Sequence, residues 1–373
     1  MNSGHTYEAE HYVGLMSGTS LDGVDAALTE IGSTGQVRLL HSHYLPYPDD
    51  LRTRLLGLHT PQPDEIHLTA IAANELAHLY ADTVKSLLDG FTAGRVRAIG
   101  CHGQTLRHRP ADGYTLQIGN AALLAELTGI AVVADFRSRD IAAGGQGAPL
   151  VPAFHAQVLR HPDVHRVIAN IGGIANITDL PMSGSVRGWD TGPGNMLLDA
   201  WIKRHSGVHY DRDGAWAASG SVHSGLLAAL MRHAYLQLPP PKSAGREQFN
   251  LDWLDTLLLG SLDEALAPPD VQATLVEFTA MSLADAVNRE CTGAQELYVC
   301  GGGAHNRALM QRISARLPNL RVATTAMLGI DPDWVEALAF AWLARQTLHH
   351  APGNLPAVTG ARGERVLGAI YPA

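Results

Sequence analysis

A strand-like run, a glycine-rich turn and a returning strand-like run occur twice in this chain of 373 residues. The first is VGLMSGTSLDGVDAAL at residues 13–28, and the second is VIANIGGIANITDL at residues 167–180. A surface hairpin needs only one glycine or an Asn-Gly pair at its turn. Several glycines in one turn indicate that something approaches the backbone closely. The sequence therefore predicts two hairpins whose turns face a ligand.

Runs rich in Val, Ile and Leu alternate with longer segments whose apolar residues recur at three- and four-residue spacing. This alternation is typical of α/β architecture. A further strand ending in glycine follows each hairpin, VRAIGCHGQT at 96–105 and ELYVCGGGAHN at 296–306. The halves share this order but little sequence identity, so we expect two related α/β lobes that present their hairpins to a shared cleft.

Strands are predicted at 11–16, 24–31, 37–47, 96–101, 114–119, 131–136, 166–172, 175–180, 296–301 and 321–325. Helices are predicted at 64–90, 121–129, 194–207, 222–237, 270–291, 306–317 and 333–348. The proline-rich stretch LPPPKSAG at 238–245 predicts a loop with a local insertion. A hinge is expected in the glycine cluster FRSRDIAAGGQGAPL at 136–150.

Composition narrows the class of protein. The net charge is −9 and no basic tract occurs, which excludes a backbone-binding nucleic-acid surface. The first sixteen residues show no signal peptide, and the apolar runs are too short for a bilayer span. Three cysteines without C-x-x-C spacing predict reduced thiols. We therefore expect a cytoplasmic protein of two domains without membrane or nucleic-acid partners.

The common nucleotide and hydrolase motifs are absent. The sequence has no Gly-Lys pair, no G-x-G-x-x-G and no G-x-S-x-G. Backbone N–H groups of a glycine-rich turn can still hold an anion, each bond to a charged oxygen contributing about 1.5–3 kcal/mol. Turns from both lobes could thus hold a triphosphate without lysine. In SGTSLDG, hydroxyls would add donors and Asp22 could hold Mg²⁺ through water, whereas a ligand-free hairpin is the alternative.

The stretch RGWDTGPGNMLLDAW at 187–201 is the second strong signal. A strand is predicted to end at Asp190, and a helix to begin near Asn195. Helix N-termini attract phosphate, and Gly192 and Gly194 would leave room for one. Asp190 would lie beside that anion and accept a proton from a nucleophile. The alternative is an N-cap, but Asp190 lies four residues before Gly194, which favours the base.

Three further stretches have two interpretations each. The glycines of CGGGAHN at 300–306 would allow an adenine or ribose to lie against the backbone, or the loop simply enters a helix capped by Asn306. The polar segments 101–108 and 134–152 are predicted to be substrate-side loops, although Arg137 could instead form an ion pair between lobes. Glu336, in an otherwise apolar helix, is either partnered or functional.

The chain closely resembles one family, the 1,6-anhydro-N-acetylmuramate kinases of bacterial peptidoglycan recycling. The strings that carry the resemblance include GLMSGTSLDG, HGQT, QIGN, VADFRSRDIAAGGQGAPLVPAFH, NIGGIANIT, DTGPGN, GGGAHN, FAWLA, PGNLPAVTGA and LGAIYPA. They run along nearly the whole chain. The resemblance implies an α/β fold of two actin-like ATPase (ribonuclease H-like) lobes, each a mixed sheet flanked by helices, with a cleft between them.

The resemblance also implies a reaction. The γ-phosphoryl of ATP would pass to O6 of the anhydro-sugar while water opens the 1,6-ether bridge, giving N-acetylmuramate 6-phosphate and ADP. ATP with Mg²⁺, a cytoplasmic location and a homodimer are implied as well. Two alternatives stay open: an ATP-driven binding protein on the same fold, like actin or the heat-shock chaperones, and a kinase for another sugar or acid.

By this resemblance Asp190 is the base, residues 18–25 contact ATP phosphate, and Arg137 and Glu336 hold sugar or the attacking water. With the glycine turns added, the predicted ATP-binding residues are Gly18, Thr19, Ser20, Leu21, Asp22, Gly23, Val24, Asp25, Gly172, Gly173, Gly192, Gly194, Asn195, Gly301, Gly302, Gly303 and Asn306. The predicted sugar-binding residues are Ser17, His102, Gln104, Thr105, Arg137 and Gly145. Residues 1–135 and 352–373 would form the first lobe, with one phosphate hairpin and part of the sugar site. Residues 136–351 would form the second, with Asp190, the other phosphate hairpin and the adenosine loop.

Overall fold

The computed structural model describes residues 9–18, 20–245, 248–260 and 266–373. Contacts divide the chain into unit 1, Met1–Leu159 with Trp334–Ala373, and unit 2, Arg160–Asp333. Residues 136–159 and 334–351, which the sequence interpretation placed in the second lobe, are thus grouped with unit 1. The physical reason is that helix α13 (Val335–Leu348) packs directly on the first strand of unit 1.

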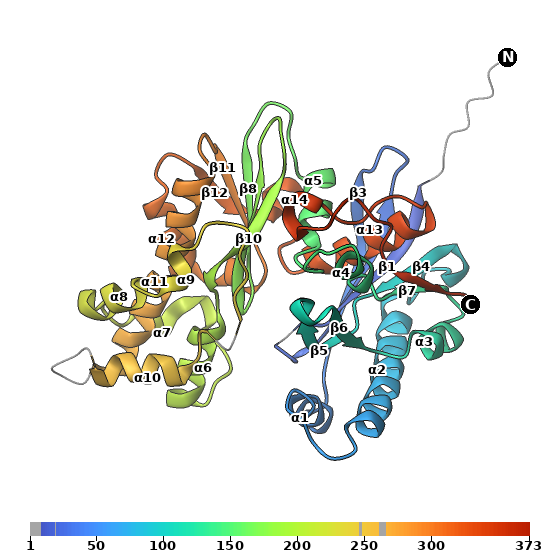
Figure 1. Cartoon of the computed structure of the whole chain (residues 1–373), viewed down its shortest axis with the longest axis horizontal. Helices are drawn as coiled ribbons and strands as arrows, with labels where there is room; N and C mark the ends of the chain where they lie inside the picture. Colours follow the sequence, from blue (N-terminus) through green and yellow to red (C-terminus); the bar gives the residue numbers. More distant parts are fainter. Residues whose placement is uncertain (1–8, 19, 246–247, 261–265) are drawn as a thin grey trace. The chain divides into compact units, whose positions relative to one another are not determined.

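Unit 1 is built on a mixed sheet with the strand order β13-β7-β4-β1-β2-β3 (Figure 1). Its strands are β1 (Glu10–Met16), β2 (Gly23–Ile31), β3 (Val37–Pro46), β4 (Val96–Cys101), β7 (Val132–Ala134) and β13 (Ala369–Tyr371), and a separate ribbon pairs β5 (Gln104–Arg109) with β6 (Tyr114–Ile118). The helices are α1 (Asp49–Gly57), α2 (Glu65–Leu87), α3 (Ala121–Thr128), α4 (Ser138–Ala142), α5 (Val151–Val158), α13 and α14 (Pro356–Thr359).

The two faces of this sheet are covered differently. Val13 and Leu15 of β1 join one buried core with residues of α2 and α3. On the other face, α13 crosses β1 and β4 at two glycines. A Cβ at Gly14 would lie 1.8 Å from the carbonyl oxygen of Ala337, and one at Gly100 would lie 2.0 Å from that of Phe340. Only glycine therefore permits α13 to lie this close to the sheet.

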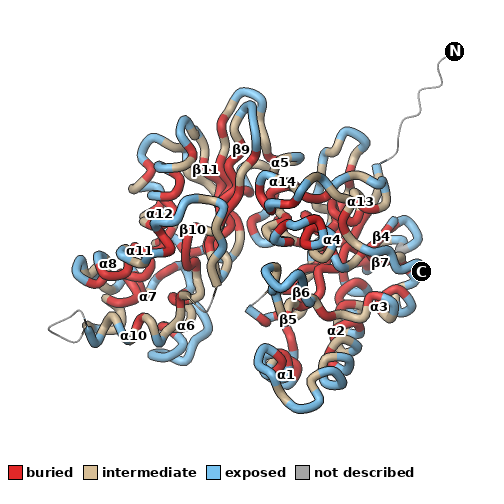
Figure 2. The backbone as a smooth tube through the Cα atoms, viewed as in Figure 1, coloured by how far each residue is buried: buried red, intermediate tan, exposed pale blue. Residues whose placement is uncertain are grey.

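Unit 2 has a sheet with the order β10-β9-β8-β11-β12. Its strands are β8 (Arg166–Ile171), β9 (Ile174–Leu180), β10 (Arg187–Pro193), β11 (Glu296–Cys300) and β12 (Arg321–Thr324). Its helices are α6 (Met196–Ser206), α7 (Ala215–Ala218), α8 (Ser224–Met231), α9 (Ala234–Gln237), α10 (Leu251–Gly260), α11 (Pro268–Glu290) and α12 (Arg307–Arg316). Helix α11 is buried along most of its length and packs against α6, α7, α8 and α12 (Figure 2).

The two sheets share one topology. In each, three antiparallel strands are followed by two parallel strands added beside the first, so that β3-β2-β1-β4-β7 corresponds to β10-β9-β8-β11-β12. This repeat confirms the predicted α/β class with two related lobes, each a mixed sheet flanked by helices. No helix within the described residues is long and apolar enough to cross a membrane.

The structure differs from the predicted elements in several places. The segment around Gln104 and Thr105, expected to be a loop, forms strand β5. The single helix expected at 222–237 is two helices, α8 and α9, separated at Arg232 and His233. Helices α1, α5 and α10 and the strand β13 were not predicted, because each is short or lacks a clear apolar period.

Candidate functional site

The turn between β1 and β2 is tied to the core of unit 1 by Ser17. The Ser17 side chain is buried, and its hydroxyl donates to the carbonyl oxygen of Gly103 at 3.1 Å. The hydroxyl oxygen of Tyr80 lies 2.8 Å from Oγ of Ser17. Since Ser17 has one proton, Tyr80 is the donor in this second bond. Ser17, which the sequence predicts to bind the sugar, thus already donates its hydroxyl proton to a group inside unit 1.

The rest of this turn has an exposed polar side and an apolar anchor. Ser20 donates to Oδ1 of Asp22 at 2.5 Å, and both residues are exposed. Leu21 has the left-handed φ of 56° and buries its side chain in the core together with Val24. These two residues can therefore offer a nucleotide only backbone groups. Thr19, also predicted to bind ATP, lies outside the described residues.

The glycines at the two ends of the turn differ. A Cβ at Gly23 would lie 2.5 Å from the carbonyl oxygen of Leu45, so this glycine is required by packing against β3. A Cβ at Gly18 would meet no atom closer than 3.5 Å. Gly18 is thus the open glycine of this turn. Asp25 follows in β2 and is half-buried.

His102 and Arg137 form a polar pair beside the turn. Nδ1 of His102 lies 3.2 Å from the carbonyl oxygen of Ser17, and Nε2 lies 2.9 Å from Nη2 of Arg137. A carbonyl can only accept, so Nδ1 carries the proton and Nε2 accepts from the guanidinium. Burial and the Arg137 charge lower the pKa of His102 to about 3, so the imidazole is neutral at physiological pH.

The segment that holds His102 also braces the turn. Gln104 is fully buried; its Nε2 donates to the carbonyl oxygen of Gly18 at 3.1 Å, and its Oε1 accepts from the Tyr47 hydroxyl at 3.3 Å. Thr105 is half-buried and accepts from Gln117 at 3.2 Å. The structure therefore brings His102 and Gln104 to the carbonyl oxygens of two successive residues, Ser17 and Gly18.

A fully buried carboxylate, Asp140, organises the loop that carries Arg137. Its Oδ1 accepts from Nδ2 of Asn354 at 2.6 Å and from the hydroxyl of Thr359 at 2.7 Å. Its Oδ2 accepts from the N–H of Gly147 at 2.8 Å. Gly147 in turn offers its carbonyl oxygen to Arg137 at 2.8 Å. Asp140 therefore sets the position of the guanidinium through the loop.

Gly145, predicted to bind sugar, is held against the same carboxylate. A Cβ on Gly145 would lie 2.1 Å from Oδ2 of Asp140 and 3.0 Å from Ala361. Its N–H also donates to the Asp140 carbonyl oxygen at 2.9 Å. Packing alone therefore explains why this position is glycine.

Glu336 lies in the first turn of α13, and its carboxylate acts on Arg137. Burial lowers the pKa of Arg137 to about 10, while the charges of Glu336 and Asp140 act in the opposite direction. The guanidinium stays charged at neutral pH. Because α13 is seated on Gly14 and Gly100, the position of Glu336 is set by the sheet. Unit 1 thus brings together His102, Arg137 and Glu336, and their binding of substrate stays a prediction.

In unit 2 the turn between β8 and β9 meets the start of α6. The N–H groups of Gly194 and Met196 donate to the carbonyl of Gly173 at 2.9 and 3.1 Å, and that of Asn195 donates to the carbonyl of Gly172 at 2.8 Å. A Cβ on Gly194 would lie 2.3 Å from the Gly172 oxygen, whereas one on Gly172 or Gly173 would meet nothing closer than 3.8 Å. The first amides of α6 are therefore engaged inside unit 2, and the turn glycines are the open ones.

Strand β10 is longer than predicted. It continues through Asp190 to Pro193, so the turn expected at 191–194 is mostly strand. The extra length is accommodated by a register shift between Asp190 and Gly192 against β9. Gly192 has φ 148° and packs near Leu236 and Ser282, so the glycine adopts the backbone conformation that this register shift requires.

The Asp190 carboxylate is held from one side. Its Oδ2 accepts from the N–H of Ala244 at 2.9 Å, and no hydrogen bond reaches Oδ1 from any residue that the structure describes. The backbone of Asp190 accepts from the Tyr235 hydroxyl at 2.8 Å and donates to the carbonyl of Lys242 at 3.1 Å. Burial raises the pKa of Asp190 to about 6, against the Ala244 N–H and the Lys242 charge, which lower it. The bonding is not that of an N-cap of α6, and the pKa suits a general base near neutral pH.

The loop after β11 contains two packed glycines and one open glycine. A Cβ on Gly301 would lie 2.4 Å from Oδ1 of Asn170, and one on Gly303 would lie 2.4 Å from Ile171. A Cβ on Gly302 would meet nothing closer than 3.6 Å. The loop can thus offer a ligand its backbone chiefly at Gly302.

Asn306 is the N-cap of α12. Its Oδ1 accepts from the N–H of Leu309 at 3.0 Å, and the side chain is buried. A Cβ on Gly214 would lie 2.2 Å from that oxygen, so the cap is closely packed. The capping interpretation of Asn306 is confirmed, and its contact with a nucleotide stays a prediction.

Sequence reasoning missed the residues that support these groups. They are Tyr47, Tyr80, Asp140, Asn354 and Thr359 in unit 1, and Tyr235, Lys242 and Ala244 in unit 2. Two signals were available. Asn354 and Thr359 lie in the string PGNLPAVTGA, which carried the resemblance but received no role, and Lys242 is one of three lysines in the chain.

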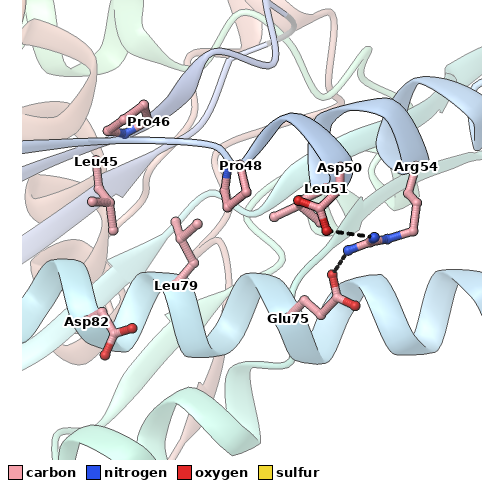
Figure 3. Close-up of a pocket in the computed structure, with 9 residues that line it drawn as sticks. All are labelled: Leu45, Pro46, Pro48, Asp50, Leu51, Arg54, Glu75, Leu79 and Asp82. Atoms are coloured by element: carbon pink, nitrogen blue, oxygen red, sulfur yellow. Dashed lines mark hydrogen bonds and ion pairs between the residues drawn. The ribbon is translucent and has the colours of Figure 1, made fainter.

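A hollow lies elsewhere in unit 1. It has a volume of about 340 Å³ and lies between the end of β3, α1 and α2 (Figure 3). Leu45, Leu51 and Leu79 line it, and Arg54 bridges Asp50 and Glu75 at its edge. None of the predicted site residues lines this hollow, so it is separate from the groups described above.

The family model and the relatives found by sequence name the same family. Residues 10–373 match the model of the family described as anhydro-N-acetylmuramic acid kinase. A protein of that name from Thiobacillus denitrificans is 74% identical over 373 residues, all of both chains. One from Nitrosomonas europaea is 56% identical over 97% of this chain and 100% of its own length.

Among solved structures, the activator of the 2-hydroxyisocaproyl-CoA dehydratase from Clostridium difficile aligns with a TM-score of 0.47 at 12% identity, covering 89% of this chain and 92% of that one. The sequence matches extend over essentially the whole chain at far higher identity. The chain therefore belongs to the anhydro-N-acetylmuramic acid kinase family of phosphotransferases.

Proposed function

We propose that this protein opens the 1,6-anhydro bridge of 1,6-anhydro-N-acetylmuramate with water and transfers the γ-phosphoryl group of ATP to O6. The products are N-acetylmuramate 6-phosphate and ADP, and the pathway is the recycling of cell-wall peptidoglycan. Family membership over the whole chain supports the kinase. The observation that carries the mechanism is the Asp190 carboxylate, held through Oδ2 alone by the described residues and desolvated to a pKa of about 6.

The chemistry of the sugar explains why such a base is needed. O6 of the anhydro-sugar is an ether oxygen and has no proton to lose. The base therefore deprotonates a water that attacks the anomeric carbon C1. As the C1–O6 bond breaks, O6 gains the electron pair with which it attacks the γ-phosphorus, and the bond to the β-phosphate oxygen breaks. Asp190 would serve both steps with its Oδ1, and such general-base catalysis contributes about 10²–10⁴-fold.

Unit 1 would supply the sugar contacts. Arg137 is a charged guanidinium, steadied by neutral His102 and by Gly147, and Glu336 acts on it. This arrangement suits recognition of the lactyl carboxylate of a muramate sugar, since Arg forms paired bonds with carboxylates. Glu336 would help to orient the sugar or the attacking water. Gln104 and Ser17, whose hydrogen bonds hold the turn, would act mainly through its backbone.

Backbone amides would hold ATP. The open glycines Gly18, Gly172, Gly173 and Gly302 are the positions where a phosphate or ribose meets no Cβ. Residues 18–25 would contact phosphate, with Ser20 adding a hydroxyl. Gly194 and Asn195 would act by holding the 172–173 turn.

Magnesium fits the exposed end of the first turn. No three His, Cys, Asp or Glu side chains gather as a metal site within the described residues, whereas Asp22 offers an exposed carboxylate that accepts only from Ser20 among them. Mg²⁺ usually keeps several waters and binds through one or two carboxylates plus phosphates. Asp22 would therefore hold it through water, and the ion would neutralise charge on the transferred phosphoryl group. The cytoplasmic location and the homodimer stay predictions.

The proposal is tested by measuring ADP release with 1,6-anhydro-N-acetylmuramate, N-acetylmuramate, N-acetylglucosamine and glucose. We expect release only with the anhydro-sugar and one sugar 6-phosphate per ADP, detected by mass spectrometry. ADP release accompanied by inorganic phosphate instead would support an ATP-driven binding protein. Release with another sugar but not the anhydro-sugar would assign a different kinase.

A further inference from the structure

One segment of unit 2 is hydrogen-bonded to Asp190 and was not assigned a role by the sequence. We name residues 235–244, which comprise most of α9 and the proline-rich loop after it, the strap. Three hydrogen bonds join the strap to Asp190: from the Tyr235 hydroxyl to its carbonyl oxygen at 2.8 Å, from its N–H to the Lys242 carbonyl at 3.1 Å, and from the Ala244 N–H to Oδ2 at 2.9 Å. The strap therefore bonds to both the backbone and the carboxylate of Asp190.

Lys242 closes the strap on itself. Its ammonium group donates to the carbonyl oxygens of Tyr235 and Leu236 at 3.1 and 3.3 Å, and it lies 4.6 Å from the centre of the Tyr235 ring. The start and the end of the strap are thereby joined. Without this ammonium group, the carbonyl groups of Tyr235 and Leu236 lose their hydrogen bonds to the loop that carries Ala244.

The charged surroundings of Lys242 indicate that its placement is not incidental. Burial and the Arg289 charge lower the pKa of Lys242 to about 8, against Glu290 and Asp190, which raise it. Asp285 lines the same small cavity of about 20 Å³, which has room for roughly one water. The other two lysines, Lys85 and Lys203, are exposed. The chain thus places its one half-buried lysine at the segment that holds Asp190.

We propose that Lys242 is a positioning residue for the reaction: by closing the strap, it directs the Asp190 carboxylate so that Oδ2 is held and Oδ1 faces the water. This inference rests on the proposed function. The new element is that the orientation of the Asp190 carboxylate depends on Lys242, a side chain that would contact neither substrate. Its consequence is that loss of Lys242 impairs the chemical step more than substrate binding.

The test compares Lys242→Met with Lys203→Met, an exposed lysine of α6 in the same unit. We expect Lys242→Met to lower kcat by about 10²-fold, the loss typical of a misplaced catalytic group, with little change in KM for either substrate. The ammonium charge lowers the pKa of Asp190, so its loss raises that pKa. The acidic limb of kcat against pH then moves upward, by about one unit. Lys242→Arg, which keeps the charge, should restore the limb.

The outcomes separate the two proposals. If the wild type shows no anhydro-sugar-dependent ADP release, or Asp190→Asn stays active, the proposed function is wrong. If both behave as proposed while Lys242→Met keeps the wild-type kcat and acidic limb, only the positioning role is wrong. A lowered kcat with an unmoved limb would mean a merely structural lysine. Should Lys242→Met fail to fold by circular dichroism, Lys242→Gln, which removes the charge but keeps a donor near the two carbonyl groups, is judged by the same two readouts.

Discussion

The two units share a strand order but hold their functional groups by different means. In unit 1 side chains hold side chains: Arg137 donates to Nε2 of His102, and Asp140 accepts from Asn354 and Thr359. In unit 2 the corresponding hydrogen bonds come mostly from main-chain N–H groups. The Asp190 carboxylate accepts from a main-chain amide, and the 172–173 turn accepts from the first amides of α6.

One strand topology can therefore position functional groups either by side-chain hydrogen bonds or by backbone hydrogen bonds. A side-chain network depends on the identity of each polar partner, because a buried group left without its partner is costly. A backbone network depends on conformation and on the glycines that permit close approach. Unit 1 should therefore be sensitive to polar substitutions, and unit 2 to glycine and strap substitutions.

The largest effect is expected at Asp190, the carboxylate of unit 2 that we propose as the general base. Asp190→Asn keeps an acceptor for the Ala244 N–H but cannot take a proton. We expect the rate of both ring opening and ADP release to fall by about 10²–10⁴-fold. Sugar binding, measured by calorimetry, should survive. Substantial product formation by the variant would remove Asp190 from this role.

The next effect tests the side-chain network of unit 1. Asp140→Ala leaves the buried donors of Asn354, Thr359 and Gly147 without their acceptor. We expect the free energy of unfolding to fall by about 3–5 kcal/mol, measured by denaturant unfolding. The control is Asp112→Ala, an exposed residue of the same unit. Equal stability of the two variants would contradict the side-chain account of unit 1.

A pair of glycines tests the backbone network of unit 2. Gly172→Ala adds a Cβ with no atom closer than 3.8 Å, whereas Gly194→Ala places one 2.3 Å from the Gly172 oxygen. We expect Gly172→Ala to keep the wild-type Tm and to raise the Kd for an ATP analogue about tenfold, through loss of a phosphate bond. Gly194→Ala should lower the Tm. If Gly172→Ala binds like the wild type, the turn is not a nucleotide site.

The smallest effect concerns stability against pH. The folded-state pKa of Asp190, about 6, exceeds its ordinary value of 3.8. Folding is therefore disfavoured progressively as pH rises from 3.8 to 6, and by the full amount above 6. Asp190→Asn removes this effect, so its Tm should exceed that of the wild type at pH 8 and approach it near pH 4. A Tm difference independent of pH would show that Asp190 is not desolvated.

The sequence predicted the strands of the sheets better than the hydrogen-bond networks that hold the site residues. Alternation places Val13 and Leu15 on one face and Gly14 on the other, so β1 and its hairpin could be predicted from local spacing alone. The Asp140 network could not, because Asn354 lies 214 residues further along the chain. No local pattern reports a hydrogen bond between segments that only the fold brings together.

The candidate site shows the same limit. Asp190 was predicted from its neighbouring glycines, and His102 and Arg137 from polar groups near strand ends. The strap was seen only as a proline-rich loop, since its role depends on where Tyr235 and Ala244 meet β10. The start of α6 was predicted to hold phosphate, yet its amides bond to the 172–173 turn, an encounter that spacing does not predict.

The seat of α13 on Gly14 and Gly100 has a consequence for how the protein is made. Unit 2 is one continuous stretch, whereas unit 1 combines the beginning of the chain with its final segment. On the ribosome, residues 160–333 emerge before α13 does, so unit 2 has all its parts first. Unit 1 must wait with the α13 face of its sheet uncovered and with Asp140 lacking Asn354 and Thr359. A chain that stops before α13 would thus contain every element of unit 2 but lack the helix that covers one face of the unit 1 sheet.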